Sequence, residues 1–196
     1  MIDNITSFNK YSVIDSCSVK NLVSTNTLYQ AAQREKCQFI ISNFIEYELL
    51  HRERKNIDSL TEDRIKELDQ LIKKKINTGE IPKFDIDISD LFDPLIRNQS
   101  SLRSRGEITA IILARKFKIG MVTDDIKAQK IAKQNLTDDM VDSIPSLFGW
   151  LIYNKKLYDA DKDKIISEQK YYYRSQEKQL GKVYRVALEK ILVDNK

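Results

Sequence analysis

Short apolar runs and longer amphipathic stretches alternate along most of the chain. Apolar runs of roughly four to eight residues that stop at polar residues indicate buried strands, whereas apolar residues spaced three and four apart indicate helices. From these patterns we expect strands at residues 11–15, 37–42, 83–89 and 121–123. We expect helices at residues 19–36, 43–54, 60–76, 90–98, 106–117 and 125–134, with a polar loop at 99–105.

The order of these elements predicts an α/β protein. Repeated strand–helix units build a parallel sheet with helices on both faces, so we expect a three-layer α/β/α sandwich with a central, mainly parallel sheet. In residues 83–89, apolar residues alternate with polar ones, which indicates a half-exposed or edge strand.

The last part of the chain carries a separate amphipathic pattern. Its apolar residues follow the helical spacing i, i+3, i+4, i+7 from Leu180 to Leu192. We therefore expect a domain at residues 1–158 and a C-terminal helical extension at residues 159–196. The apolar stripe is expected to dock on the domain or on a second protomer, as in a homodimer.

Composition indicates a charge-rich globular protein, with 41% hydrophobic and 32% charged residues. No apolar run approaches the roughly 20 residues that span a bilayer. The N-terminus does not have a basic start followed by an apolar core, so we expect no secretory signal. Cys17 and Cys37 lack CxxC spacing, so we interpret both as reduced thiols and the protein as cytoplasmic, without membrane contact.

The positive charge is concentrated at one end of the chain. The net charge is +4, and the whole excess lies in residues 150–196, where 11 basic residues stand against 7 acidic ones. A weak, localised positive field suits a polyanionic partner, and a solvated lysine-rich helix face explains it equally well.

Acidic residues stand where the predicted strands end. Asp15 closes the first strand, and Glu46 lies in the first turn after the second. Asp124 and Asp125 follow the last strand. The carboxyl ends of parallel strands meet at one edge of an open sheet, where functional groups gather. Glu107, in the first turn of its helix, joins them if that helix begins at the same edge.

Such a cluster of acids predicts a metal site. Neighbouring carboxylates raise one another's pKa and repel, and a hard cation with oxygen ligands, Mg²⁺ or Mn²⁺, offsets that repulsion. One or two such ions would activate water and stabilise the oxygens of an in-line phosphodiester cleavage. The single histidine, His51, provides neither a His-rich zinc site nor a histidine pair for metal-free ribonuclease chemistry.

Each acid taken alone has a structural alternative. Asn43-x-x-Glu46 and Ser104-x-x-Glu107 match capping boxes, in which the glutamate satisfies backbone N–H groups. Asp125 is equally well placed as a simple helix cap. A carboxylate that ends an apolar strand, as Asp15 does, is buried and needs a partner. The joint placement of the acids therefore favours a shared site.

Four segments, in this order, resemble the PIN-domain family: YSVIDSCSV, SNFIEYELL, SRGEITAIILARKFKIGMVTDDIKAQKIA and SLFGWLIYNKKLYD. Together they cover residues 11–158. The third is the most specific, with an acid that opens an Ala-rich helix and then a strand ending in TDD. The resemblance implies a metal-dependent endoribonuclease, often the toxin of a type II toxin–antitoxin pair.

The resemblance also implies roles for the acids. Asp15, Glu46 and Glu107 correspond to the family's acidic triad, and the fourth acid corresponds to Asp125 or Asp124, a choice that the TDD motif leaves open. RNA, single-stranded or structured, is the implied substrate, with DNA as an open alternative and an antitoxin protein as the partner of a toxin. The chain departs from the small toxins through a helical insert at 58–79 and the C-terminal extension.

Two other functions fit the same pattern. One is a non-catalytic PIN-like module that binds RNA or protein, which is disfavoured because no acid of the set is missing. The other is a phosphoryl-transfer or receiver-like domain. An acid at a helix start and the absence of a DxD motif at a strand end disfavour it.

Residues next to the acids are candidates for supporting roles. Three hydroxyls are placed to orient the carboxylates or bound water, or simply to cap helices: Ser16, Ser18 and Thr123. Three basic residues are placed to contact RNA phosphates, with solvated surface charge as the alternative: Arg103, Arg105 and Lys127.

A tyrosine cluster offers a further RNA contact. Tyr171, Tyr172 and Tyr173, followed by Arg174, combine stacking surface with positive charge, as single-stranded RNA requires. Packing of these tyrosines in the core or at an interface is the favoured alternative.

Overall fold

The computed structural model describes residues 5–51, 59–92 and 105–194. Within them, five parallel strands form one sheet in the order β3-β2-β1-β4-β5. The strands are β1 (Tyr11–Ile14), β2 (Gln38–Ser42), β3 (Lys83–Phe84), β4 (Gly120–Val122) and β5 (Val141–Asp142). The predicted α/β class and the parallel sheet are confirmed.

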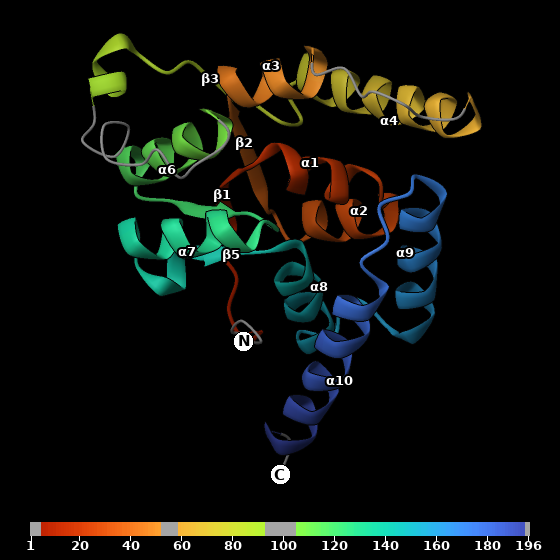
Figure 1. Cartoon of the computed structure of the whole chain (residues 1–196). Helices are drawn as coiled ribbons and strands as arrows, with labels where there is room; N and C mark the ends of the chain where they lie inside the picture. The colour runs from red at the N-terminus through yellow and green to blue at the C-terminus, as the bar shows by residue number, and fades with distance from the viewer. Residues whose placement is uncertain (1–4, 52–58, 93–104, 195–196) are drawn as a thin grey trace.

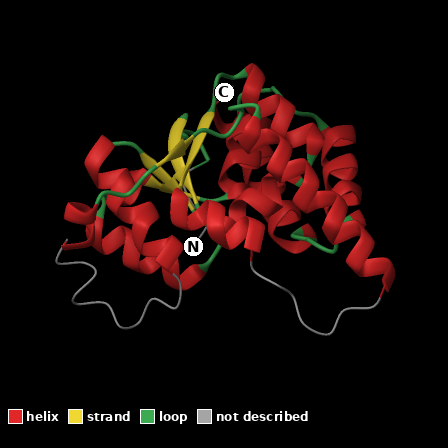
Figure 2. Ribbon diagram, turned by 90° about the horizontal axis from the view of Figure 1, so that it is seen from above, coloured by secondary structure: helices red, strands yellow, loops and turns green. Residues whose placement is uncertain are grey.

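Helices cover both faces of the sheet, and Figure 2 shows the strands between two groups of helices. On one face lie α6 (Arg105–Phe117) and α7 (Ile126–Asn135); on the other lie α1 (Ser16–Val23), α2 (Asn26–Arg34) and α8 (Ile144–Tyr153) (Figure 1). The predicted three-layer α/β/α sandwich is therefore confirmed.

Four further helices complete the described structure. α3 (Asn43–His51) and α4 (Ser59–Asn77) extend across the end of the sheet where β2 finishes, whereas α9 (Asp159–Tyr171) and α10 (Glu177–Asp194) lie beside α2 and α8 (Figure 1). None of the helices in the described ranges is both long and apolar enough to cross a bilayer.

The strands are buried on both faces, as a parallel sheet between two helix layers requires. Val13, Ile14, Met121 and Val122 are fully buried in β1 and β4. The strand order reverses between these two strands, since the chain runs from β1 to β2 and β3 on one side and to β4 and β5 on the other. In open α/β sheets, ligands bind at such a switch point, beyond the carboxyl ends of the strands.

The predicted helix at 19–36 is wrong in one respect, because it is two helices. α1 ends at Val23 and α2 begins at Asn26. Between them, the Ser24 hydroxyl donates to the Asn21 carbonyl and the Thr25 hydroxyl donates to the Leu22 carbonyl. Hydroxyl side chains that bond back to the backbone compete with the helical pattern, and they end α1 here.

The predicted strand at 83–89 is also too long. β3 pairs with β2 at only two positions, the last being Ser42 with Phe84, because β2 itself ends at Ser42. The chain then forms a short 3₁₀ helix, η1 (Ile88–Phe92), where a helix at 90–98 was expected. Most of that helix and of the predicted loop lies outside the described residues, and Arg105 already belongs to α6.

Two short elements have no counterpart in the sequence prediction. They are the two-residue strand β5 and the 3₁₀ helix η2 (Asp138–Met140) that precedes it. A strand of two residues is too short to produce a recognisable apolar run.

The C-terminal extension shares the core of the preceding residues. Leu180, Val183 and Ala187 are buried on α10, which packs along α8. The Glu168 carboxylate of α9 accepts hydrogen bonds from the backbone N–H and the hydroxyl of Thr27, at 3.0 and 2.8 Å, in the first turn of α2. The first part of the apolar stripe therefore docks on the rest of the chain, whereas Leu188 and Leu192 are 39% and 68% exposed. A domain boundary at 158 stays a prediction.

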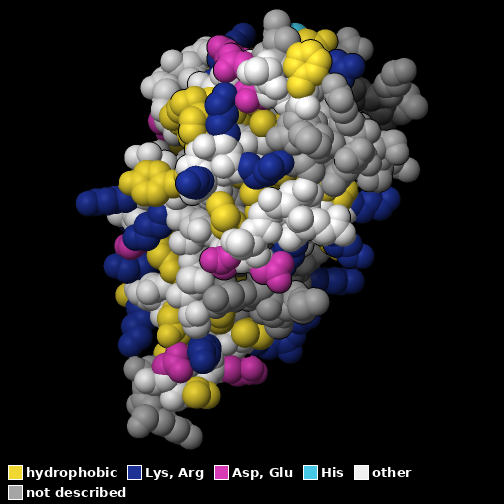
Figure 3. Space-filling model, turned by 90° about the vertical axis from the view of Figure 1, so that its left-hand side faces the viewer, with side chains coloured by type: hydrophobic (Ala, Val, Ile, Leu, Met, Phe, Trp, Pro, Cys, Tyr) yellow, Lys and Arg dark blue, Asp and Glu magenta, His cyan; other side chains and the backbone are white. Residues whose placement is uncertain are grey.

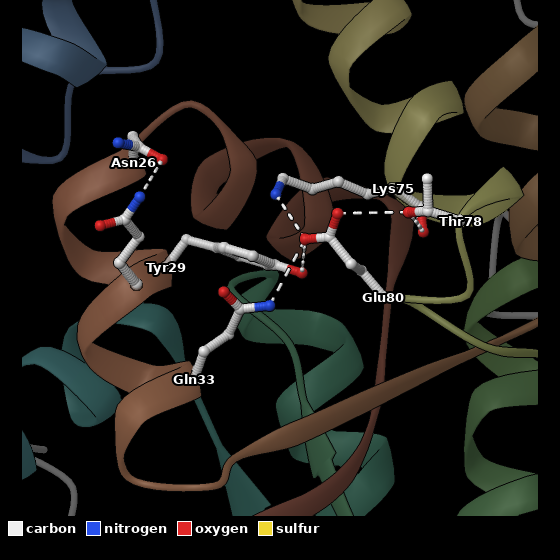
Figure 4. A network of polar contacts seen from close by, with 7 residues as sticks. Asn26, Tyr29, Gln33, Lys75, Thr78 and Glu80 are labelled. Carbon is white, nitrogen blue, oxygen red and sulfur yellow. Dashed lines mark hydrogen bonds and ion pairs between the residues drawn. The ribbon is translucent and has the colours of Figure 1, made fainter.

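A polar network fastens α2 to the end of α4 (Figure 4). One Glu80 carboxylate oxygen accepts from Lys75 at 3.0 Å, Tyr29 at 3.3 Å and Gln33 at 3.4 Å, and the other accepts from Thr78 at 3.2 Å. The Lys75 ammonium also lies 3.7 Å from the centre of the Tyr29 ring. The hydrogen bond from Lys75 is the main reason that the pKa of Glu80 lies below its ordinary value.

We expect this network to stabilise the fold in a pH-dependent way. Because the folded-state pKa of Glu80 is lowered, its contribution is present above the unfolded pKa and is lost as the pH falls through the folded value. The side chain is 37% exposed, so Glu80→Gln should cost less than about 1 kcal/mol at neutral pH, measured by urea unfolding. Glu62→Gln, in an exposed pair with Lys66, is the control and should cost less. Equal losses would contradict the role of Glu80.

The close approach of α10 to α8 depends on Gly149. A Cβ added there would lie 2.4 Å from Val183 Cγ1 and 2.9 Å from Ile5 Cγ2, whereas a Cβ at Gly181 would meet nothing within 4 Å. Both glycines are helical, so alanine raises the helix propensity at each. We expect Gly149→Ala to lower the free energy of unfolding by about 1–3 kcal/mol and Gly181→Ala to raise it slightly. Chemical denaturation of both variants checks this; a stable Gly149→Ala would refute the close contact.

Candidate active site

Asp15 lies at the switch point, directly after β1, and it is also the N-cap of α1. One carboxylate oxygen accepts a hydrogen bond from the Ser18 backbone N–H at 2.7 Å, and the other accepts one from the Thr123 hydroxyl at the end of β4. The register that pairs Ile14 with Val122 brings Asp15 and Thr123 side by side. Asp15 is only 3% exposed, so the strand ends enclose it.

Burial leaves the charge of Asp15 poorly compensated. Its pKa is raised to about 6, chiefly by desolvation; the Thr123 and Ser18 hydrogen bonds act against this rise, and nearby Asp124 adds to it. Across residues 5–51, 59–92 and 105–194, no lysine or arginine forms an ion pair with it. The expectation that this acid is buried and has partners is met, and those partners are neutral.

Asp124 is the second acid at the switch point. Its backbone N–H donates to the Ser18 hydroxyl at 2.9 Å, so Ser18 contacts both acids. Its carboxylate accepts from Asn21 Nδ2 at 2.6 Å and from the Ile144 backbone N–H at 2.8 Å, at the start of α8. Burial raises the pKa of Asp124, and the hydrogen bond from Asn21 is the largest opposing effect.

Asp125 has a different environment from its neighbour. It is exposed and caps α7, where one of its oxygens accepts from the N–H groups of Lys127 and Ala128 at 2.7 and 3.1 Å. The helix-cap alternative is therefore confirmed for Asp125. Of the two acids in the TDD motif, Asp124 is the one whose charge acts on Asp15.

On α3, Glu48 rather than Glu46 points toward the starts of α1 and α6. Glu46 forms an ion pair with Lys83 of β3 at 3.0 Å. Glu48 accepts from the Ser16 hydroxyl at 3.1 Å and from the Gly106 backbone N–H at 3.3 Å. The two glutamates are roughly 200° apart around the helix, so they cannot share a target.

Gly106 allows Glu48 to approach α6. A Cβ at this position would lie 2.6 Å from a Glu48 carboxylate oxygen, so a side chain would displace it. Glu48 thereby links Ser16, which follows Asp15, with Gly106, which precedes Glu107. It is the acid that the sequence analysis missed, although the segment SNFIEYELL contains it.

Glu107 is half-buried in the first turn of α6. The start of that helix is tied to the end of β2, because the hydroxyls of Ser42 and Thr109 lie 2.8 Å apart. α6 therefore begins at the edge of the sheet where β1 and β2 end, which is the condition for Glu107 to join the other acids. Ser104 lies outside the described residues, so the capping-box alternative for Glu107 stays untested.

The capping box expected at Asn43-x-x-Glu46 is replaced by a cap from the residue before it. The Ser42 hydroxyl accepts from the Ile45 backbone N–H at 3.1 Å, while Asn43 accepts from the Ile86 N–H of the neighbouring segment. Glu46 is therefore held by Lys83, not by a cap.

The C-terminal segment reaches the site through Arg174. Its Nε donates to Asn21 Oδ1 at 2.8 Å, and Nη2 lies 3.3 Å from the Cys17 carbonyl oxygen and 3.2 Å from its sulfur. Asn21 in turn holds Asp124, so the guanidinium stabilises that acid through a shared neighbour. Arg174 was predicted as an RNA contact of the tyrosine cluster, and its link to Asn21 was not foreseen.

The tyrosines before Arg174 pack against α4. Arg64 lies over the rings of Tyr171 and Tyr173, at 4.5 and 5.4 Å from their centres, and the Tyr172 hydroxyl donates to Glu67 at 2.8 Å. This agrees with the packing alternative. Their contacts fix the segment that carries Arg174.

The remaining predicted residues are placed unevenly. Thr123 and Ser18 contact Asp15, and Ser16 contacts Glu48. Arg105 and Lys127 are exposed at the starts of α6 and α7, while Arg103 lies outside the described residues. Within the described ranges, no three His, Cys, Asp or Glu side chains are grouped closely enough to form a ready metal site.

The chain matches no protein-family model, no curated protein and no solved structure. The PIN-family resemblance therefore stays a prediction, and the site rests on its own geometry.

The burial of Asp15 makes a prediction about stability and pH. Its pKa rises from 3.8 to about 6 on folding, so the folded protein retains a proton that the unfolded chain releases, and stability falls as the pH rises through this range. At neutral pH the loss is about 2–3 kcal/mol. Asn can accept from the Ser18 N–H through its oxygen and donate to the Thr123 hydroxyl through its NH₂ group. Asp15→Asn should therefore abolish the loss and be the more stable protein at neutral pH in EDTA.

Urea unfolding between about pH 4 and pH 7 measures this effect. Asp125→Asn is the matched control, since asparagine caps a helix as well as aspartate does and Asp125 is exposed. If wild-type protein and Asp15→Asn lost stability in parallel over this range, Asp15 would not be the buried acid responsible.

Proposed function

We propose that this protein is a divalent-metal-dependent nuclease that cleaves RNA at the edge of the sheet where β1 and β4 end. The observation that carries the proposal is Asp15, a buried carboxylate next to Asp124 without a basic partner in the described chain. A buried acid of this kind is unfavourable unless a cation joins it.

The available donors fit Mg²⁺ or Mn²⁺. Both ions prefer carboxylate oxygens, which the acids at this edge supply, whereas the nearby Cys17 thiol is already in contact with Arg174. Asp15 and Asp124 would hold the ion from the sheet, with Glu48 and Glu107 approaching from α3 and α6. Glu46 is replaced in this set by Glu48, because Glu46 is paired with Lys83.

A bound ion would supply an activated water and stabilise the attacking and leaving oxygens. The chain's own residues keep the acids in place. Thr123 and Ser18 orient Asp15, Asn21 and the Ile144 N–H orient Asp124, and Ser16 orients Glu48. Hydrogen bonds of this kind to metal-binding carboxylates tune their orientation and basicity.

Basic residues near the site suit a phosphate backbone. Figure 3 shows Lys and Arg side chains spread over the face that α6 and α7 form, whereas Asp and Glu side chains gather there in small groups. Lys127 and Lys130 of α7 are exposed. The Arg174 guanidinium donates to Asn21, which in turn donates to Asp124. Phosphate contacts position RNA without reading its sequence, which suits an endonuclease.

Cleavage of a labelled single-stranded RNA tests the proposal. We expect turnover with Mn²⁺ or Mg²⁺, none with EDTA, and a loss of about a hundredfold or more in Asp15→Asn, because that variant loses a charged ligand while its amide can still bond to Ser18 and Thr123. Thermal unfolding establishes that the variant is folded. Cleavage that persists in EDTA and in Asp15→Asn would contradict the proposed metal-dependent nuclease. RNA binding without turnover at saturating Mn²⁺ would identify a non-catalytic binding module instead.

Glu48 and Glu46 provide a matched pair within one helix. We expect Glu48→Gln to reduce the cleavage rate by about tenfold to a hundredfold, and Glu46→Gln to change it by less than about threefold. Rates at saturating Mn²⁺ and the Mn²⁺ concentration for half-maximal rate should be measured for both. A larger effect from Glu46→Gln would show that the sequence resemblance, rather than the geometry, identifies the correct acid.

The toxin role that the resemblance implies belongs to the same proposal. Toxicity on expression in a bacterial host, relieved in Asp15→Asn, would support it; harmless expression of an active nuclease would place the protein among stand-alone RNA-processing enzymes.

A further inference from the structure

A pocket of about 230 Å³ has Asp124 in its lining. It is bounded by α7, the start of α8 and α10, so the C-terminal helix forms one of its walls. Asp124 lines it and also belongs to the candidate active site. A ligand in this pocket would therefore adjoin the acids.

Three glutamines line the pocket, and two of them have a free hydrogen-bonding function. Gln176 is committed, because its side-chain oxygen accepts from Gln169 Nε2, its backbone N–H donates to Gln169 Oε1, and its side chain also hydrogen-bonds to Asp124. Gln129 donates to the Thr123 carbonyl at 2.8 Å, which fixes its amide and leaves its oxygen as an acceptor. Gln179 is exposed at the rim and has no hydrogen bond within the described chain.

The pocket also contains one cation. Lys182 is exposed on α10, and none of the described acids forms an ion pair with it. An ammonium that forms no ion pair, even with Asp124 in the same lining, is available for an anionic group.

The remaining walls are apolar. Pro145 and Val183 are in the lining, as is Ile126, which is 70% exposed. Apolar walls, neutral amides and a single cation together match a flat heterocycle with hydrogen-bonding edges that is joined to a phosphate. They do not match a bare inorganic anion, for which amides and apolar walls are of little use.

We infer that this pocket binds one unpaired nucleotide of the RNA substrate, adjacent to the bond that is cleaved. This rests on the proposed nuclease function for the identity of the ligand. The base lies between the apolar walls with its edge toward Gln129 and Gln179, and Lys182 contacts a phosphate oxygen. Recognition of unpaired, splayed bases through their edges is the usual mode for single-stranded RNA.

Binding measurements in EDTA test the inference without any cleavage. Fluorescence anisotropy with a short labelled single-stranded RNA should show binding weakened about tenfold by Lys182→Glu, since a phosphate contact becomes a repulsion. Lys178→Glu is the matched control, with the same charge change on the same helix outside the pocket lining, and should change binding by less than about twofold.

A second pair of variants blocks the pocket instead of changing its charge. Gln179→Trp should fill the opening and weaken RNA binding about fivefold or more, whereas Gln134→Trp, at an exposed glutamine of α7 away from the lining, should have little effect. Thermal unfolding of all four variants shows whether they are folded.

Nucleotide monophosphates separate the remaining outcomes. Adenosine and uridine monophosphates, titrated into the full chain, should shift the NMR signals of the Gln129 and Gln179 side-chain amides. Shifts without any effect of Lys182→Glu and Gln179→Trp on RNA binding would make the pocket a free-nucleotide site and overturn the inference, as would no shift and no effect. If Lys182→Glu and Gln179→Trp both weaken RNA binding but the wild-type protein does not cleave RNA, the pocket is an RNA-binding site and the proposed nuclease function is wrong.

Discussion

The buried carboxylate of Asp15 is the constraint on which the site depends. An acid at the end of an apolar strand must find hydrogen-bond donors inside the protein, and here they come from α1 and from the end of β4. The same side chain therefore joins two strands at the point where the strand order reverses. Because these donors are neutral, burial keeps the pKa of Asp15 raised, and this edge of the sheet favours the arrival of a cation.

The C-terminal segment contacts the residues of this site rather than standing apart from them. Arg174 holds Asn21, Asn21 holds Asp124, and α10 closes a pocket beside the same acid. The segment can reach so far because Gly149 lets α10 lie close against α8 and because the tyrosines before Arg174 are fixed on α4. The packing of α10 on α8 therefore helps to set the position of Arg174 and, through Asn21, that of Asp124.

Neighbouring acids acquire different roles through their surroundings. Asp124 is enclosed by donors from α1 and α8, while Asp125, one residue later, faces solvent and caps a helix. On α3, one glutamate forms an ion pair with a lysine of the edge strand, and the other accepts hydrogen bonds from the starts of α1 and α6. Asp124 and Asp125 are adjacent in sequence, and Glu46 and Glu48 are two positions apart on one helix. The side chains of each pair nevertheless point in different directions and have different partners.

The sequence by itself determined the α/β class, the parallel sheet and the acid that closes β1, because these follow from local periodicity and from the cost of burying a charge. It could not choose between Glu46 and Glu48, since they flank the buried stripe of Ile45 and Leu49 on opposite sides and periodicity treats both alike. Nor could it relate Arg174 to Asn21, 153 positions away. Such choices depend on which face of a helix meets which strand, and only tertiary packing decides that.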